Sequence, residues 1–123
     1  MPRLDLFCID ENNTIKDAIA AIQANHSRCV IVVNAKKKVV GVFSEGDVLK
    51  AILADTDVHA PLSRIIKPSF HYLNEKDMLK AYELVKKYSI TLIPVTDKDF
   101  KLTDIITIFD IMDQLVFGKK GNK

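Results

Sequence analysis

The sequence predicts a mixed α/β fold in which two pseudo-symmetric β-α-β-β-α units pack against each other through their sheets. The chain has 123 residues, of which 48% are hydrophobic and 28% charged, a size and composition that fit one globular domain or two very small ones. Shifting the sequence by 63 positions aligns its second half with its first without a gap. A unit of about 60 residues is only marginally stable alone, because it buries a small fraction of its surface, so we expect the two units to dock.

The internal repeat divides the chain into a first unit over residues 1–58 and a second over residues 59–117, followed by a basic tail over residues 118–123 that we expect to be disordered. Most apolar positions of the first half align with apolar positions of the second. Five aligned pairs are identical: Phe7 with Phe70, Ala18 with Ala81, Val32 with Val95, Lys38 with Lys101, and Asp47 with Asp110.

The first half begins with a predicted short strand over Leu4–Ile9. A helix capped by Asn12 or Asn13 follows and ends near Asn25, because apolar residues recur in it at steps of three and four. The β-branched run Cys29–Val33 and the apolar run Val39–Phe43 predict a buried hairpin. A second helix is expected from Ser44 to Leu53.

The second half repeats this order after a polar connection over residues 54–63. A short strand precedes a helix, a hairpin and a last helix. The expected elements are a strand over Ser69–Leu73, a helix over Asn74–Tyr88, strands over Leu92–Val95 and Lys101–Ile106, and a helix over Thr107–Phe117.

Charge and cysteine content exclude several classes of protein. A formal net charge of +2 does not indicate a nucleic-acid or membrane partner, and the lysine run at residues 36–38 is expected to be a solvated hairpin tip. The two cysteines and three scattered histidines lack metal-ligand spacing. No apolar leader or membrane-length run occurs, so we expect a cytoplasmic protein.

Each half carries a hydroxyl residue followed three positions later by aspartate, where its last strand gives way to its last helix: Ser44 and Asp47, then Thr107 and Asp110. One interpretation is a capping box that stabilises the start of the helix by about 1 kcal/mol. The other is a nucleotide site, because a helix N-terminus binds phosphate and a carboxylate accepts both hydroxyls of a ribose. The two interpretations are compatible.

The ordered set of these segments resembles the cystathionine-β-synthase (CBS) domain family, and specifically the tandem CBS pair known as a Bateman module. The resemblance extends from about Leu4 to Leu115. It rests on the segments Thr14–Ala18, Val30–Asn34, Val40–Leu49, Leu92–Asp97 and Thr107–Ile111.

The resemblance implies two clefts for adenosine-containing ligands such as AMP, ADP, ATP or S-adenosylmethionine, with no cofactor required. Asp47 and Asp110 would hold ribose hydroxyls. The phosphates would face Ser44, Thr107, Arg28 and Thr91. Adenine would lie against Ile65, Phe70 and Ile90 in the Asp47 cleft, and against Phe7 and Ser27 in the Asp110 cleft.

The two halves depart from the family pattern in different places. The glycine before the hydroxyl motif is present as Gly41 but replaced by Asp104, and the strand proline is present as Pro94 but replaced by Ile31. A carboxylate at Asp104 would repel phosphate, and Arg28 would attract it. We therefore expect at most one tight site, centred on Asp47.

No nucleophile or phosphate-loop motif occurs, so enzymatic activity is not expected. The expected function is regulatory: an adenosine ligand shifts the packing of the halves or of paired chains. The alternative is a ligand-free scaffold for dimerisation, or a regulatory fragment of a sugar-phosphate nucleotidyltransferase, since Glu45–Leu53 looks similar to CBS pairs fused to such enzymes. A homodimer is expected from the apolar faces of Val48–Leu53 and Ile111–Val116, and the regulated partner is an unknown enzyme or transporter.

Overall fold

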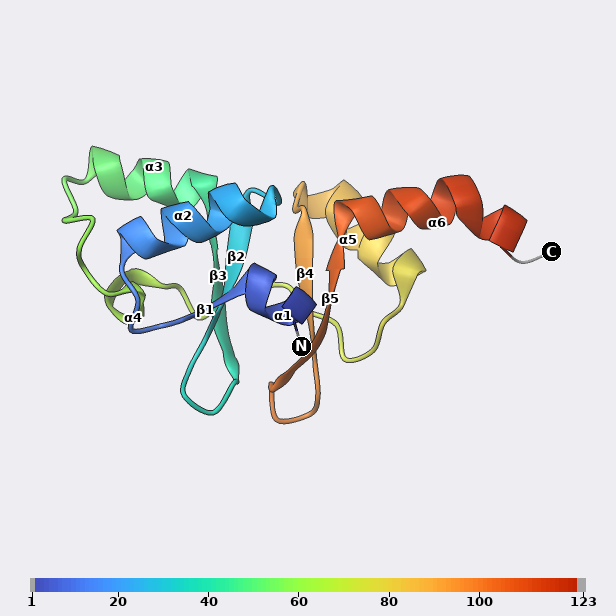
Figure 1. Cartoon of the computed structure of the whole chain (residues 1–123), viewed down its shortest axis with the longest axis horizontal. Helices are drawn as coiled ribbons and strands as arrows, with labels where there is room; N and C mark the ends of the chain where they lie inside the picture. The colour runs from blue at the N-terminus through green and yellow to red at the C-terminus, as the bar shows by residue number, and fades with distance from the viewer. Residues whose placement is uncertain (1, 122–123) are drawn as a thin grey trace.

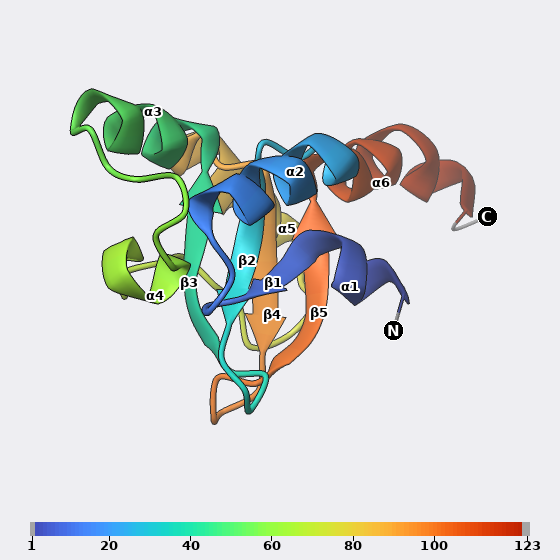
Figure 2. The same ribbon diagram turned by 60° about the vertical axis from the view of Figure 1, so that its left-hand side comes forward.

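The chain folds into two halves whose sheets face each other, with most of the helices on the outside (Figure 1). The computed structural model describes the backbone of residues 2–121 and the side chains of residues 3–114. Figure 2 shows the strands of both halves running side by side through the centre of the molecule. The expected fold, two units packed through their sheets, is confirmed.

The first half contains a three-stranded sheet in the order β1-β2-β3, made of Cys8–Asp10, Cys29–Val33 and Val39–Ser44. β1 runs parallel to β2, and β2 pairs with β3 as an antiparallel hairpin. Helices α2 (Ile15–Asn25) and α3 (Glu45–Leu53) pack on one face of this sheet. A single turn of helix, α4 (Leu62–Ile65), lies in the connection to the second half.

The second half contains the antiparallel hairpin of β4 (Leu92–Thr96) and β5 (Leu102–Thr107), flanked by α5 (Met78–Tyr88) and α6 (Ile108–Gly121). Successive side chains of a strand point to opposite faces of the sheet. Val30 and Val32 of β2 accordingly pack toward α2, while Ile31 and Val33 pack toward Leu92 and Ile105 of the other half. This alternation places one core layer between the two sheets.

The two halves are hydrogen bonded to each other at both ends of their strands. At the hairpin tips, the Val39 N–H donates to the Phe100 carbonyl at 2.8 Å and the Leu102 N–H donates to the Lys37 carbonyl at 3.0 Å. At the opposite end, the Thr91 hydroxyl donates to the Ser27 carbonyl. Hydrogen bonds therefore join the halves at both ends of their strands.

The N-terminal segment corrects a prediction. A strand was expected over Leu4–Ile9, but residues Pro2–Phe7 form the short helix α1 and only Cys8–Asp10 form β1. Proline is favoured in the first helical turn. Leu4 and Phe7, three residues apart, lie on one face of this helix and pack into the core between the sheets.

The strand expected over Ser69–Leu73 is also absent, apart from a single parallel bridge between Leu73 and Val95. In that bridge the Leu73 N–H donates to the Pro94 carbonyl at 3.1 Å, and the Thr96 N–H donates to the Leu73 carbonyl at 2.9 Å. Repeating the pattern two residues earlier would require residue 94 to donate to the His71 carbonyl. Pro94 has no N–H, so the ladder cannot continue.

Helix ends differ from expectation by a few residues. Thr14, rather than Asn12 or Asn13, caps α2, and Asp77 caps α5, which begins at Met78 instead of Asn74. Helix α6 extends to Gly121, so residues 118–121, expected to belong to a disordered tail, are helical. A glycine such as Gly118 costs a helix only about 1 kcal/mol, which is too little to force an end. Residues 122–123 lie outside the described residues.

Candidate functional site

Ser44 and Asp47 form a complete capping box at the start of α3. The Ser44 backbone N–H donates to Asp47 Oδ2 at 2.9 Å, and the Asp47 N–H donates to Ser44 Oγ at 3.2 Å. The Ser44 hydroxyl in turn donates to the same Oδ2 at 3.0 Å. These bonds hold the carboxylate beside the helix N-terminus, and the structural interpretation of the motif is confirmed.

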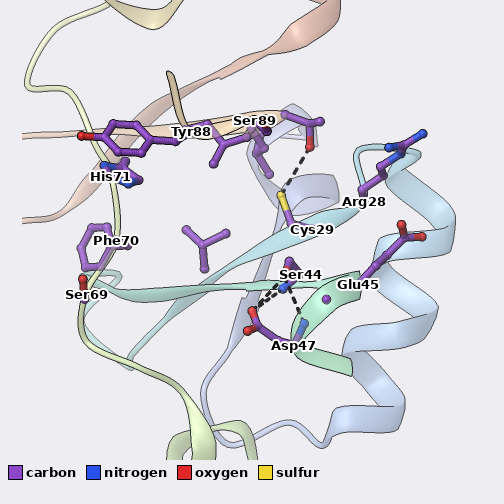
Figure 3. Close-up of a pocket in the computed structure, with 15 residues that line it drawn as sticks. Arg28, Cys29, Ser44, Glu45, Asp47, Ser69, Phe70, His71, Tyr88 and Ser89 are labelled. Carbon is purple, nitrogen blue, oxygen red and sulfur yellow. Dashed lines mark hydrogen bonds between the residues drawn. The ribbon is translucent and has the colours of Figure 1, made fainter. Parts of the chain in front are cut away.

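This carboxylate lies on the wall of a cavity of about 420 Å³ that opens between the two halves (Figure 3). The first half contributes Arg28, Cys29, Val42 and the residues Ser44–Asp47. The second half contributes two segments, Ser69–His71 and Tyr88–Leu92. Polar and charged groups of one half thus face a wall of aromatic, aliphatic and hydroxyl side chains from the other, at a volume within the range of small-molecule sites.

Charges of both signs surround this cavity. Arg28 extends from the segment before β2, while Glu45 lies in the first turn of α3 next to the capping box (Figure 3). On the opposite wall the His71 and Tyr88 rings stack with centroids 3.9 Å apart. Burial raises the pKa of the Cys29 thiol to about 11, so this cavity residue stays protonated and unreactive at neutral pH.

A second cavity of about 310 Å³ adjoins the first, and Val42, Asp47 and Ser69 belong to both. Its remaining walls are mainly apolar, with two lysines. The side chains involved are those of Phe43, Lys50, Ala51, Ala54, Thr56, Ile65, Ile66 and Lys67. Asp47 therefore stands between a mainly apolar cavity and a cavity with Arg28 and the start of α3.

The corresponding carboxylate of the second half, that of Asp110, forms an ion pair in addition to its capping box. The Thr107 N–H donates to Asp110 Oδ2 at 2.8 Å and the Asp110 N–H donates to Thr107 Oγ1 at 3.1 Å, which repeats the capping box at the start of α6. However, Arg3 Nη2 lies 2.5 Å from the same Oδ2 and forms an ion pair with it. Partial burial alone would raise the pKa of Asp110, but the Thr107 N–H and the Arg3 guanidinium more than offset this and hold it below its usual value.

The structure brings together most of the residues expected at the Asp47 cleft. Six of the candidates line the larger cavity: Arg28, Ser44, Asp47, Phe70, Ile90 and Thr91. Thr91, expected among the residues that face phosphate, is one of these six. Ile65 lines the smaller cavity.

The residues expected to hold adenine in the Asp110 cleft are buried. Phe7 is only 8% exposed and packs in the core between the sheets. Ser27 is 2% exposed, with its N–H donating to Asn25 Oδ1 at 2.7 Å. Asp104, expected to repel phosphate there, has its carboxylate 3.5 Å from Lys76 Nζ.

Sequence reasoning missed Arg3, the residue whose contact most clearly distinguishes the Asp110 carboxylate from the Asp47 carboxylate. The 63-residue repeat carried a signal, because it aligns Arg3 with Ile66. Ile66 lines the cavity beside Asp47, whereas Arg3 is bound to Asp110. The expected strand over Leu4–Ile9 hid this signal, since a strand does not place Arg3 on a helix beside α6.

Within the part of the chain that the structure describes, no helix combines the length and the apolar character needed to cross a bilayer. The same described residues contain no cluster of three or more His, Cys, Asp or Glu side chains placed to hold a metal ion.

Known proteins with similar sequences or folds share this architecture. The magnesium transporter MgtE of Thermus thermophilus is 26% identical over 113 residues, which cover 87% of this chain and 24% of the transporter. The chain spans only about a fifth to a quarter of the first curated relatives that it matches. An acetoin utilization protein (AcuB) structure from Vibrio cholerae superimposes with a TM-score of 0.77 at 24% identity, covering 92% of this chain and 87% of that one.

A further solved structure is a CBS domain protein of Pyrobaculum aerophilum complexed with AMP. It superimposes with a TM-score of 0.73 at 20% identity and covers 98% of both chains. The CBS domain family model matches twice, over residues 1–54 and 63–116, which correspond to the two halves of the fold. The chain therefore belongs to the CBS domain family and contains a tandem CBS pair.

Proposed function

We propose that this CBS pair is a non-catalytic regulatory module that binds an adenosine nucleotide at Asp47 and transmits its presence through the packing of the two halves. The observation that carries the proposal is the position of Asp47 between two adjoining cavities whose walls come from both halves. AMP in the Pyrobaculum aerophilum neighbour supports the ligand class.

Asp47 would hold the ribose. Both hydrogen bonds that its carboxylate accepts within the described residues end on Oδ2, so Oδ1 retains its acceptor capacity. A carboxylate accepts two hydroxyl donors at once, and hydrogen bonds to an ionised acceptor are stronger than neutral ones. A ribose with both hydroxyls free fits this requirement better than a deoxyribose.

We assign the base to the smaller cavity and the phosphate to the larger one. Ile65, Ile66 and Val42 give the smaller cavity apolar walls. The larger cavity contains Arg28 and the start of α3, where backbone N–H groups and the helix dipole favour an anion. Phe70 and Ile90, expected beside adenine, line this larger cavity rather than the smaller one, so we reassign them to cover the ribose and phosphate from the second half.

The charges favour AMP over ATP. Among the residues that the structure describes, Arg28 is the only lysine or arginine that lines the larger cavity, and the Glu45 and Asp47 carboxylates lie on the same wall. Each additional phosphate would bring more negative charge toward Glu45, which is repulsive in a partly desolvated site. A ligand that bridges both halves shifts their packing by no more than its differential affinity for the two arrangements.

Thermal unfolding with AMP, ADP, ATP and S-adenosylmethionine tests the function. A ligand present at 100 times its Kd stabilises the native state by about 2.7 kcal/mol, which raises the Tm by on the order of 10 °C for a domain of this size. Asp47→Asn should remove most of the shift, because the amide keeps the capping acceptor but loses the charge. Asp110→Asn is the matched control and should retain it. Unchanged melting with all four ligands would contradict the proposal.

An interaction scaffold is the second candidate function, supported by exposed apolar side chains on α3 and α6. Leu49 and Leu53 of α3 are 62% and 85% exposed, and Phe109 and Met112 of α6 are 54% and 51% exposed. We assign these faces to a second copy of the chain. Light scattering during size exclusion should give a dimer that Leu53→Lys converts to a monomer, and the scaffold becomes the better account if the dimer forms while no adenosine ligand binds.

A further inference from the structure

We propose that Arg3 closes a second adenosine site at Asp110 and thereby sets how many nucleotides the chain binds. The inference rests on the proposed function, because it assumes that Asp47 and its counterpart are both able to hold a ribose. It adds a residue that decides which of the two carboxylates is available.

The carboxylates of Asp47 and Asp110 make equivalent hydrogen bonds to the backbone at the start of their helices. Each accepts the backbone N–H of the hydroxyl residue at the helix cap, at 2.9 Å for Asp47 and 2.8 Å for Asp110. In each case the aspartate N–H donates back to that hydroxyl, at 3.2 and 3.1 Å. Their backbone settings therefore do not distinguish the two sites.

The difference lies in what the other half presents to each carboxylate. Beside Asp47 the second half presents Ile66, which lines the smaller cavity. At the position aligned with Ile66, the first half presents Arg3, whose guanidinium forms an ion pair with Asp110 Oδ2. Both bonds that Asp110 accepts within the described residues also end on Oδ2, so Arg3 would compete with a ribose through the space and the charge of its guanidinium beside that oxygen, whereas an isoleucine offers Asp47 no such competitor.

The ion pair between Arg3 and Asp110 can be displaced by a competing ligand. The side chains of Arg3 and Asp110 are 39% and 24% exposed, so water partly screens their attraction. Arg3 also lies on α1, a helix of only six residues. A contact of this kind weakens a competing ligand by about tenfold, the low end for a hydrogen bond between charged groups. Removing the Arg3 side chain should therefore make the Asp110 carboxylate available again.

Calorimetric titration with AMP tests the inference on the full chain. The wild type should bind one AMP, with any second step at least tenfold weaker than the first. Arg3→Gln should strengthen the second step about tenfold and bring the stoichiometry to two. Adding Asp110→Asn to Arg3→Gln should return it to one, while Arg3→Lys, which keeps the charge without the guanidinium, should fall between wild type and Arg3→Gln.

A second step that Arg3→Gln leaves unchanged, or weakens, would overturn the inference while leaving the proposed function intact. A first step that Asp47→Asn fails to weaken would overturn the proposed function instead, and absence of AMP binding in both the wild type and Arg3→Gln would overturn both. A ligand-free measurement provides an independent test: carboxyl NMR titration should show the pKa of Asp110 rising toward its usual value of 3.8 in Arg3→Gln. No change in that pKa would mean that Arg3 does not occupy Asp110 in solution.

Discussion

The two halves of the molecule share a backbone plan but differ at the strand position occupied by Ile31 in the first and Pro94 in the second. Ile31 is fully buried in β2, and β1 pairs beside it as a regular parallel strand. Pro94 offers no N–H, so the segment Ser69–His71 stays outside the sheet and becomes a wall of the larger cavity. The first half therefore has a complete first strand, whereas the second half keeps only the bridge between Leu73 and Val95.

Exchanging these residues gives the largest expected effect on stability. Ile31→Pro removes a buried side chain and a backbone donor at once and should lower the free energy of unfolding by about 3 kcal/mol or more. That corresponds to a fall in Tm of roughly 10 °C, measured by circular dichroism. Pro94→Ile is the matched variant and should melt within a few degrees of wild type. Equal losses in both variants would mean that the strand pairing does not depend on this position.

A smaller effect is expected at the next pair of aligned positions, Gly41 and Asp104. A Cβ atom added at Gly41 would lie 2.5 Å from Ile66 Cγ1 and 2.8 Å from the Lys67 carbonyl oxygen, and the second contact is with backbone. Gly41→Ala should therefore cost about 2 kcal/mol by overpacking and should weaken AMP binding by displacing Ile66. Urea unfolding measures the first effect and calorimetry the second.

Asp104→Ala provides the comparison for Gly41→Ala. It breaks only a partly exposed ion pair with Lys76, so the stability should change by less than about 1 kcal/mol. If Asp104→Ala lowers the free energy of unfolding as much as Gly41→Ala does, close packing at Gly41 does not account for the difference between the two halves.

The smallest expected effect concerns the pH dependence of stability. The pKa of Asp110 is below its usual value of 3.8 in the folded chain, so the unfolded state binds more protons in this range. The resulting stabilisation is complete above about pH 3.8 and is lost as the pH falls through the folded-state pKa. In Arg3→Gln part of this loss should disappear from a series of urea midpoints below pH 5. Unaltered pH dependence would place the origin of the low pKa in the capping box alone.

The sequence was sufficient to predict the repeated architecture, because apolar periodicity and the 63-residue offset report directly on which faces are buried. The resemblance to the CBS family implied that Asp47, Arg28, Phe70 and Ile90 share a cleft, and all four line the larger cavity. The sequence was insufficient at the first strand of each half. The secondary structure of such short segments depends on their tertiary partners. Leu4 and Phe7 pack into the core between the sheets as part of a helix, and Ser69–His71 lies beside a strand in which Pro94 has no N–H to donate. Arg3 was missed for the same reason, since its role depends on the helix that carries it.

The hydrogen bonds that join the halves at both ends of their strands constrain any response to a nucleotide. Val39 with Phe100 and Leu102 with Lys37 hold one pole of the molecule, and Thr91 with Ser27 holds the other. Attachments at two poles resist a relative twist of the halves but permit a small hinge rotation about the line between the poles. Occupancy near Asp47 would therefore be read as such a rotation, with the exposed faces of α3 and α6 changing their mutual angle.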